Sequence, residues 1–377
     1  MQSHLPRIAE EEDSRFLSEQ LVTCIGNKRA LLDFIERGLA RVSRRLGGRK
    51  LDILDAFSGS GVVSRFFKRF ARRLVVNDLE LYADLANRCY LANARDLDLE
   101  RLRDIHRRLV ERLEACDGTG PHDGFIAELY APKDEENIEK GERVFYTRRN
   151  ALYLDWARSL IEGIDEADKP FFLAPLLSEA SIHANTAGVF KGFYKDAATG
   201  IGRFGGGGED ALQRIRGAIT LPFPLFSNFD CEVEALRGDA AQAAEAAGSV
   251  DLAYLDPPYN QHPYGSNYFM LNLIAEWRRP AAMSRVSGIP EDWQRSDYNS
   301  RPRAFAALED LVDRLQAKFV LLSFNSEGFI PRRDMEALFR KHGKLEVMER
   351  DYSVFKGSRN LGARSIKVKE FLYLLEK

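Results

Sequence analysis

The chain has 377 residues, of which 45% are hydrophobic and 30% charged, and its formal net charge is −2. This length exceeds what one hydrophobic core usually supports, so we expect two domains or one domain with a large insertion. No apolar run approaches the roughly 18 residues that a membrane helix needs, and residues 1–20 lack a secretory signal pattern, so we expect a cytoplasmic protein without a membrane partner. The four cysteines form no Cys-x-x-Cys pair, which argues against zinc, and we predict no metal.

The N-terminal part alternates between strands and helices, as a parallel doubly wound sheet does. An apolar strand over 51–57 precedes a helix over 62–70, and a second strand over 74–79 precedes a helix over 80–94. We therefore predict an α/β fold that begins in this region.

Residues 96–229 break this alternation. Apolar residues at helical spacing predict an amphipathic helix over 102–113, and residues 117–124 read as a loop. Helices and loops are expected from there to residue 229. The glycine-rich run over 202–208 lacks the Gly-Lys-Ser/Thr of a phosphate-binding loop, so it is either a mobile loop or a contact with a ligand or DNA.

Strand–helix alternation returns near residue 231. The expected strands are 231–236, 250–255 and 319–324, the expected helices are 240–247, 268–277, 302–316 and 331–342, residues 284–301 read as a loop, and residues 345–355 and 371–375 read as a closing antiparallel pair. We predict one sheet domain built from 21–95 and 230–377, with a mainly helical domain inserted over 96–229.

The first chemical signal is the turn Asp55-Ala56-Phe57-Ser58-Gly59-Ser60-Gly61, which ends a strand and opens a helix. Gly59 and Gly61 let the backbone turn sharply and approach a ligand closely. Such a turn fits nicotinamide, flavin or S-adenosylmethionine. Ser64 stands where the third glycine of a dinucleotide motif would be, which disfavours the first two.

The second signal is Asp78, at the end of the strand over 74–79. An acidic side chain about 20 residues after the glycine turn can accept hydrogen bonds from ribose hydroxyls. The alternative interpretation is a helix N-cap, and both roles are compatible.

The strongest signal is Asp256-Pro257-Pro258-Tyr259, directly after an apolar strand, where such sheets bind ligands. The prolines remove backbone donors, so the loop presents mainly acceptors. The Asp256 carboxylate and a prolyl carbonyl can accept both hydrogens of an amine and aim its lone pair at a methyl donor. Tyr259 offers a face for stacking a base. A purely structural turn is the alternative.

With these elements in this order, the chain resembles the Dam-like DNA adenine-N6 methyltransferases, whose cofactor motif precedes the target-recognition domain and whose Asp-Pro-Pro-Tyr comes last. Further matching segments are Gly26-Asn27-Lys28-Arg29 with Leu31-Leu32, Arg237-Gly238-Asp239-Ala240, Leu322-Ser323-Phe324-Asn325, Phe355-Lys356-Gly357 and Lys369-Glu370-Phe371-Leu372. The resemblance covers about two thirds of the chain.

The resemblance implies S-adenosylmethionine as the cofactor and double-stranded DNA as the partner. It places Lys28, Asp55, Phe57, Gly59, Gly61, Asp78, Asp239 and Ala240 at the cofactor, with the adenine ring near Asp239. Cys24 departs from the pattern, because the family often has an aromatic residue there. Within the insertion, residues 185–195 resemble a segment of some relatives that we expect to lie near DNA, with Lys191 and Lys195 as candidate phosphate contacts. A core-packing helix end with solvated lysines is the alternative interpretation.

The expected function is transfer of a methyl group to N6 of a flipped adenine, with a cognate restriction endonuclease as a further partner that the resemblance leaves open. Methylation of an exocyclic amine in RNA is an alternative, because Asp-Pro-Pro-Tyr serves that chemistry as well. A catalytically inactive DNA-binding subunit of the same fold is another, and a nicotinamide-dependent oxidoreductase is a more distant one.

Overall fold

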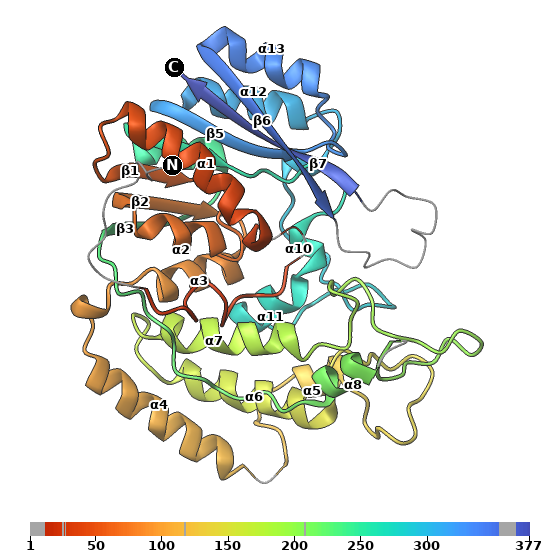
Figure 1. The fold of residues 1–377 in the computed structure, drawn as a ribbon. Coiled ribbons are helices and arrows are strands. Elements are labelled where there is room, and N and C mark those ends of the chain that lie inside the picture. Colours follow the sequence, from red (N-terminus) through yellow and green to blue (C-terminus); the bar gives the residue numbers. More distant parts are fainter. Residues whose placement is uncertain (1–11, 25, 27, 117, 207–208, 354–366) are drawn as a thin grey trace.

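The centre of the protein is a seven-stranded sheet with the order β3-β2-β1-β4-β5-β7-β6 (Figure 1). The structure is a computed structural model and describes residues 12–377 except 25, 27, 117, 207–208 and 354–366. Its strands are β1 Leu51–Asp55, β2 Ala71–Asp78, β3 Glu232–Arg237, β4 Val250–Leu255, β5 Ala317–Asn325, β6 Lys344–Ser353 and β7 Lys367–Glu376. The predicted α/β fold is confirmed.

Strands β1 to β5 are parallel, and β7 runs antiparallel between β5 and β6. All six residues of β4 are buried, as expected for a continuous apolar strand that is covered on both faces. The carboxyl ends of β1, β2, β3 and β4 therefore meet at one edge of the sheet. The turns that carry the sequence motifs follow these ends.

Helices cover both faces of the sheet (Figure 1). One face carries α1 Leu32–Arg45, α2 Val62–Lys68 and α3 Leu81–Tyr90, and the other carries α9 Ala240–Ala247, α12 Ala304–Arg314 and α13 Arg332–His342. Apolar side chains of these helices and of the strands form two buried cores, one on each side. Burial of this kind is the main favourable contribution to folding.

The segment over 96–229 is built from helices packed beneath α3 (Figure 1). These helices are α4 Leu99–Glu114, α5 Ile126–Tyr130, α6 Arg148–Glu162, α7 Lys169–Ile182 and α8 Glu209–Arg216. One apolar core joins α4, α5, α6 and α7 to α3 and to α11, Phe269–Glu276. The inserted segment thus shares its core with helices that belong to the sheet domain.

Several elements differ from the sequence-based expectation. Helix α1 was not predicted, and β2 begins three residues before its predicted start, at Ala71. The helix expected over 268–277 is preceded by a separate turn, α10 Tyr264–Asn267. The remaining short elements are 3-10 helices at Arg29–Leu31, Ala94–Asp96 and Asp297–Asn299. The last of these lies within the loop expected over 284–301.

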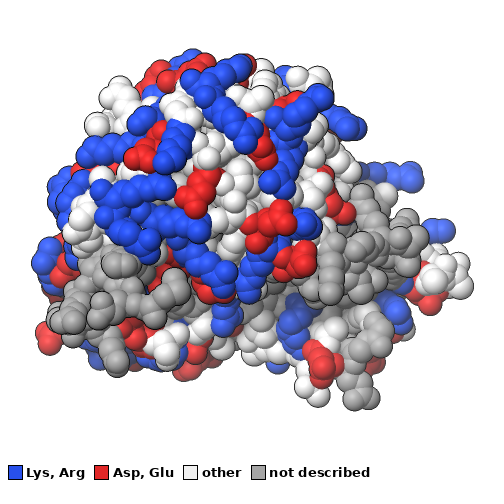
Figure 2. All heavy atoms as spheres, turned by 45° about the horizontal axis from the view of Figure 1, so that its top comes forward, with Lys and Arg blue, Asp and Glu red and all other residues white. Residues whose placement is uncertain are grey.

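Basic residues over 41–49, in the last turns of α1 and directly after it, are paired with acidic groups. Arg41 and Arg45 both lie within 3.2 Å of Glu346, and Arg49 contacts Asp251 at 2.6 Å. Figure 2 shows Lys and Arg side chains over this side of the molecule with Asp and Glu among them. These ion pairs make the run part of a surface on which charges of both signs alternate.

Among the described residues, no helix combines the length and the apolar character that a membrane span requires. Nor do these residues contain a group of three or more His, Cys, Asp or Glu side chains placed to hold a metal ion.

Candidate active site

A cavity of about 320 Å³ lies at the carboxyl ends of β1, β2, β3 and β4. Its walls come from segments that are far apart in the sequence. The predicted site residues that line it are Lys28, Phe57, Gly59, Asp78, Asp239, Ala240, Asp256 and Pro258. Four other predicted residues, Asp55, Gly61, Pro257 and Tyr259, are placed beside this cavity rather than on its wall.

The glycine turn has two residues in left-handed backbone conformations, Gly59 at φ +54° and Gly61 at φ +77°. A Cβ at Gly59 would meet no atom within 4 Å, so the turn leaves free space on the cavity side. A Cβ at Gly61 would lie 2.9 Å from Asn87 Oδ1. Gly59 therefore provides room for a ligand, whereas Gly61 allows α2 to begin close to α3.

Asp55 supports the turn from behind. Its side chain is fully buried, and its Oδ2 accepts a hydrogen bond of 2.6 Å from Ser64 Oγ. Burial raises the pKa of Asp55 to about 7, although the Ser64 hydrogen bond opposes this increase. The sequence assigned Asp55 to the cofactor, and the structure gives it contacts within the turn.

Asp78 fixes the shape of the cavity floor. Its Oδ2 accepts from the Gly59 backbone N–H at 2.8 Å, and its Oδ1 accepts from the Glu80 N–H at 3.0 Å. Burial raises its pKa above the usual value. Because each carboxylate oxygen has two lone pairs, Asp78 retains acceptor capacity toward the cavity that it lines.

Asn77 connects the turns after three strands. Its Nδ2 donates to the carbonyl oxygens of Ala56 and Gly238, both at 3.1 Å. Asp239 then caps α9 by accepting from the Ala241 N–H at 2.9 Å. These bonds hold the glycine turn and the β3–α9 turn at a fixed separation across the cavity.

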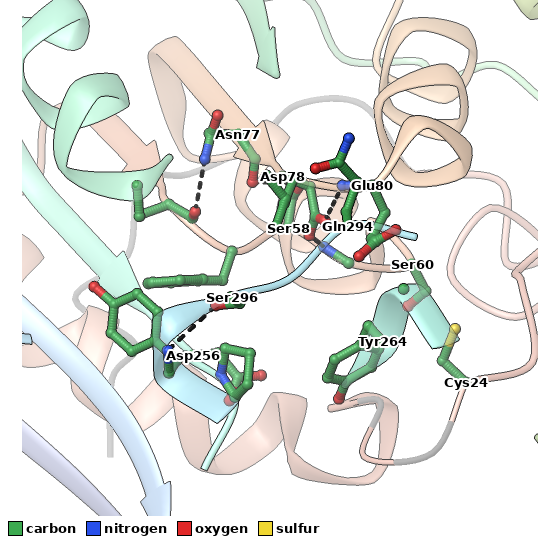
Figure 3. A pocket seen from close by; sticks show the side chains of 18 of the residues that line it. Cys24, Ser58, Ser60, Asn77, Asp78, Glu80, Asp256, Tyr264, Gln294 and Ser296 are labelled. Atoms are coloured by element: carbon green, nitrogen blue, oxygen red, sulfur yellow. Dashed lines mark hydrogen bonds between the residues drawn. The ribbon is translucent and has the colours of Figure 1, made fainter. Parts of the chain in front are cut away.

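Asp256 carries the main charge on the opposite side of the cavity (Figure 3). Its Oδ1 lies 2.9 Å from the Nζ atom of the buried Lys28, and the same Nζ lies 3.4 Å from Glu370 Oε1. Burial raises the pKa of Asp256 to about 6, while the Lys28 ammonium lowers it. Burial also disfavours charged Lys28, but the two carboxylates raise its pKa well above the usual value.

The rest of the Asp-Pro-Pro-Tyr loop packs beside Asp256. The Tyr259 ring meets Phe324 edge to face, with 6.1 Å between centroids, and the Tyr259 carbonyl accepts from the Phe329 N–H at 2.9 Å. A Cβ at Gly26 would lie 3.8 Å from the Tyr259 hydroxyl and 3.3 Å from that of Tyr264. The loop therefore adjoins the segment that carries Lys28.

Several cavity residues were not singled out as site residues from the sequence. They include Glu80, Tyr264 and the segment 294–299, in which the Tyr298 ring meets Phe57 edge to face at 5.0 Å. Glu80 had a weak signal, because it closes the same acidic stretch as Asp78. The 294–299 segment had none, because only tertiary packing brings this loop to the cavity. Cys24, which departs from the family pattern, also lines the cavity.

Residues of the cavity fit S-adenosylmethionine. Phe57 and Tyr298 offer an apolar wall for an adenine ring, and the free space at Gly59 admits a ligand close to the backbone. Asp78, Glu80 and Asp256 make the lining acidic, which suits a ligand that bears an ammonium and a sulfonium. Together with the sheet order, this site defines an S-adenosylmethionine-dependent methyltransferase.

Comparison with known proteins gives similarities to DNA methyltransferases. Residues 224–337 match the family described as D12 class N6 adenine-specific DNA methyltransferase. Type II methyltransferase M.NlaIII of Neisseria lactamica is 28% identical over 94% of this chain and 98% of its own length. Type II methyltransferase M.CviAII of Paramecium bursaria Chlorella virus 1 is 27% identical over 93% of this chain and 97% of its own length. Modification methylase StsI of Streptococcus sanguinis is 24% identical over 94% of this chain and 51% of its own length.

On these similarities the chain is an adenine-specific DNA methyltransferase that uses S-adenosylmethionine as its methyl donor. Its sequence resembles that of the Dam-like adenine-N6 DNA methyltransferases. The alternatives of an RNA methyltransferase, an inactive subunit and an oxidoreductase are set aside on this ground.

Proposed function

We propose that the loop over 256–259 binds the exocyclic amine of an adenine that has been extruded from duplex DNA. The glycine turn binds the cofactor beside this amine. The observation that carries this proposal is the position of Asp256, which lines the same cavity as Gly59 and Asp78. Bound S-adenosylmethionine supplies an electrophilic methyl group. The protein has to align the amine with that group and exclude water.

On the cofactor side of the cavity, each wall is proposed to bind one part of S-adenosylmethionine. Asp78 accepts hydrogen bonds from the ribose hydroxyls, and the carboxylate stays in place because the Gly59 and Glu80 amides hold it. Asp239 and Ala240 meet the adenine end of the cofactor, with Phe57 beside it. Lys28 adjoins the cofactor from the side of Asp256.

On the target side, Asp256 accepts one hydrogen of the amine and a prolyl carbonyl of the same loop accepts the other. Both bonds weaken the conjugation of the amine lone pair with the ring. Tyr259 provides a face for stacking, which is worth roughly 1–3 kcal/mol per base. The base must leave the duplex first, because the amine cannot reach a methyl donor from within the stack.

The helical segment over 96–229 is proposed to select the DNA sequence. Lys191 is exposed, and the Lys195 ammonium lies 4.7 Å from the centroid of the Phe193 ring. We propose that both lysines contact backbone phosphates. Because some relatives bear the name modification methylase, we also propose a role in a restriction–modification system with a cognate endonuclease.

The central test replaces Asp256 by Asn, which preserves shape and removes charge. We expect a loss of methyl transfer on the order of 100-fold or more, as for other groups that stabilise a transition state electrostatically. Transfer of a labelled methyl group to unmethylated duplex DNA measures the rate, and calorimetry with S-adenosylmethionine measures binding. An Asp256→Asn protein with the wild-type rate would refute the role of this carboxylate.

A further inference from the structure

A second carboxylate lies behind the proposed catalytic one. Glu370 is 3% exposed and sits on β7, opposite Asn325 of β5. Its Oε1 accepts a hydrogen bond of 2.7 Å from Ser323 Oγ and lies 3.4 Å from Lys28 Nζ. The Lys28 ammonium is thus shared between Glu370 and Asp256.

A lysine with two buried carboxylates is not the arrangement that would best stabilise the folded protein. Lys28 with Asp256 would already be a neutral buried pair, and adding a second buried carboxylate costs further desolvation. When all three groups are ionised, the cluster carries one excess negative charge. Such a charge complements a cationic methyl donor in the adjoining cavity. The second carboxylate also divides the attraction of the Lys28 ammonium between two partners.

We infer that Glu370 is a positioning residue for methyl transfer, which acts by holding the Lys28 ammonium so that Asp256 keeps a free, correctly oriented oxygen for the target amine. The inference rests on the proposed function of Asp256. Ser323 supports it, because its hydroxyl fixes the Glu370 oxygen that faces Lys28. Neither residue needs to touch the DNA or the cofactor.

The ionisation of Asp256 provides a readout that a structural role would leave unchanged. The ionisable groups that influence it, or that it influences, are Lys28 before α1, Asp55 on β1, Tyr254 on β4, Tyr259 in the loop after β4, Tyr264 on α10 and Glu370 on β7. Among them Lys28 lowers the pKa of Asp256 and Glu370 raises it. Since an ionised carboxylate is the better acceptor, the rate should fall as the pH drops through about 6.

The experiment compares Glu370→Gln with the wild-type enzyme in single-turnover methylation of unmethylated duplex DNA, at saturating S-adenosylmethionine, between pH 5 and 9. Loss of the Glu370 charge should move the acidic limb of the profile to lower pH, by about half a unit or more. The plateau rate should fall about tenfold, because Lys28 is less well placed. Ser323→Ala should shift the limb in the same direction and by less.

Glu376→Gln is the matched control, because Glu376 lies on the same strand and pairs with Arg45 at the surface. It should leave both the limb and the plateau unchanged. A Glu370→Gln enzyme with the wild-type limb and plateau would overturn the inference while an inactive Asp256→Asn enzyme still upheld the proposed function. Loss of activity with an unmoved limb would also overturn it, since that pattern indicates a role in folding alone.

Discussion

Buried carboxyl groups surround the base of the glycine turn, and burial governs whether they ionise. Asp55 is the clearest case, because its carboxylate is fully buried without a basic partner among the described residues, and its Oδ2 accepts a hydrogen bond from the Ser64 hydroxyl. Burial disfavours the charged form and raises its pKa to about 7. The folded protein therefore holds a proton on Asp55 over a pH range in which the unfolded chain has lost it.

This difference predicts how the stability depends on pH. The folded pKa is raised, so the contribution of Asp55 is fully present below the unfolded pKa of about 4 and is lost as the pH rises to about 7. Asp55→Asn removes the titration but keeps an acceptor for Ser64. The free energy of unfolding of this variant relative to wild type should therefore increase by on the order of 1 kcal/mol per pH unit in that window.

Denaturant unfolding at several pH values between 4 and 8 measures this difference. Asp104→Asn, which removes a carboxylate whose side chain is 58% exposed on α4, is the control. A constant difference between Asp55→Asn and wild type across the window would show that Asp55 is ionised throughout.

At the scale of the elements, helix α1 packs closely against the sheet at Gly38. A Cβ at this position would lie 2.7 Å from Leu321 Cδ1 and 2.9 Å from Leu372 Cδ2, both fully buried. The absence of a side chain lets the helix approach β5 and β7 closely. This contact holds the segment that carries Lys28 against the strand that carries Glu370.

Gly38→Val should therefore destabilise the protein by about 1–3 kcal/mol, the usual cost of overpacking a core. Thermal or denaturant unfolding measures the loss. Gly192→Ala is the control, because a Cβ there would meet nothing within 4 Å, and it should have little effect. Equal stability of Gly38→Val and wild type would indicate that α1 can move away from the sheet without cost.

The sequence predicted strands and motif turns well, for a physical reason. A buried parallel strand such as Val250–Leu255 is a continuous apolar run, and the turns after it carry the residues that contact ligands. Helix α1 was not predicted from the sequence, although Phe34, Ile35, Leu39 and Val42 lie at helical spacing and form its buried face. The predicted segment over 355–357 lies outside the described residues.

Residues of the candidate site were predicted only where a short continuous stretch of sequence forms a recognisable motif. The glycine turn, Asp78 and the loop over 256–259 each follow a strand, so spacing alone places them at one edge of the sheet. Lys28 and Glu370 form an ion pair although they are 342 residues apart in the chain (370 − 28). No local sequence pattern predicts such a contact.

At the scale of the whole molecule, the helical segment over 96–229 projects from one side of the sheet domain (Figure 1). Exchanging this segment with that of a relative should change the DNA sequence that is methylated, if it selects the target. Sequencing of modified adenines in DNA from a host that expresses the chimera measures the preference. A preference that follows residues 21–95 and 230–377 instead would contradict the assignment.

Such exchanges depend on the core that the segment shares with α3 and α11. Tyr82 of α3 and Tyr268, next to α11, lie within that core, and their rings meet edge to face at 6.0 Å between centroids. A donor segment must therefore bring a matching apolar surface, or the recipient helices must change with it. Over evolutionary time, exposed positions of the segment are free to diversify, whereas its buried seam is inherited jointly with the catalytic scaffold.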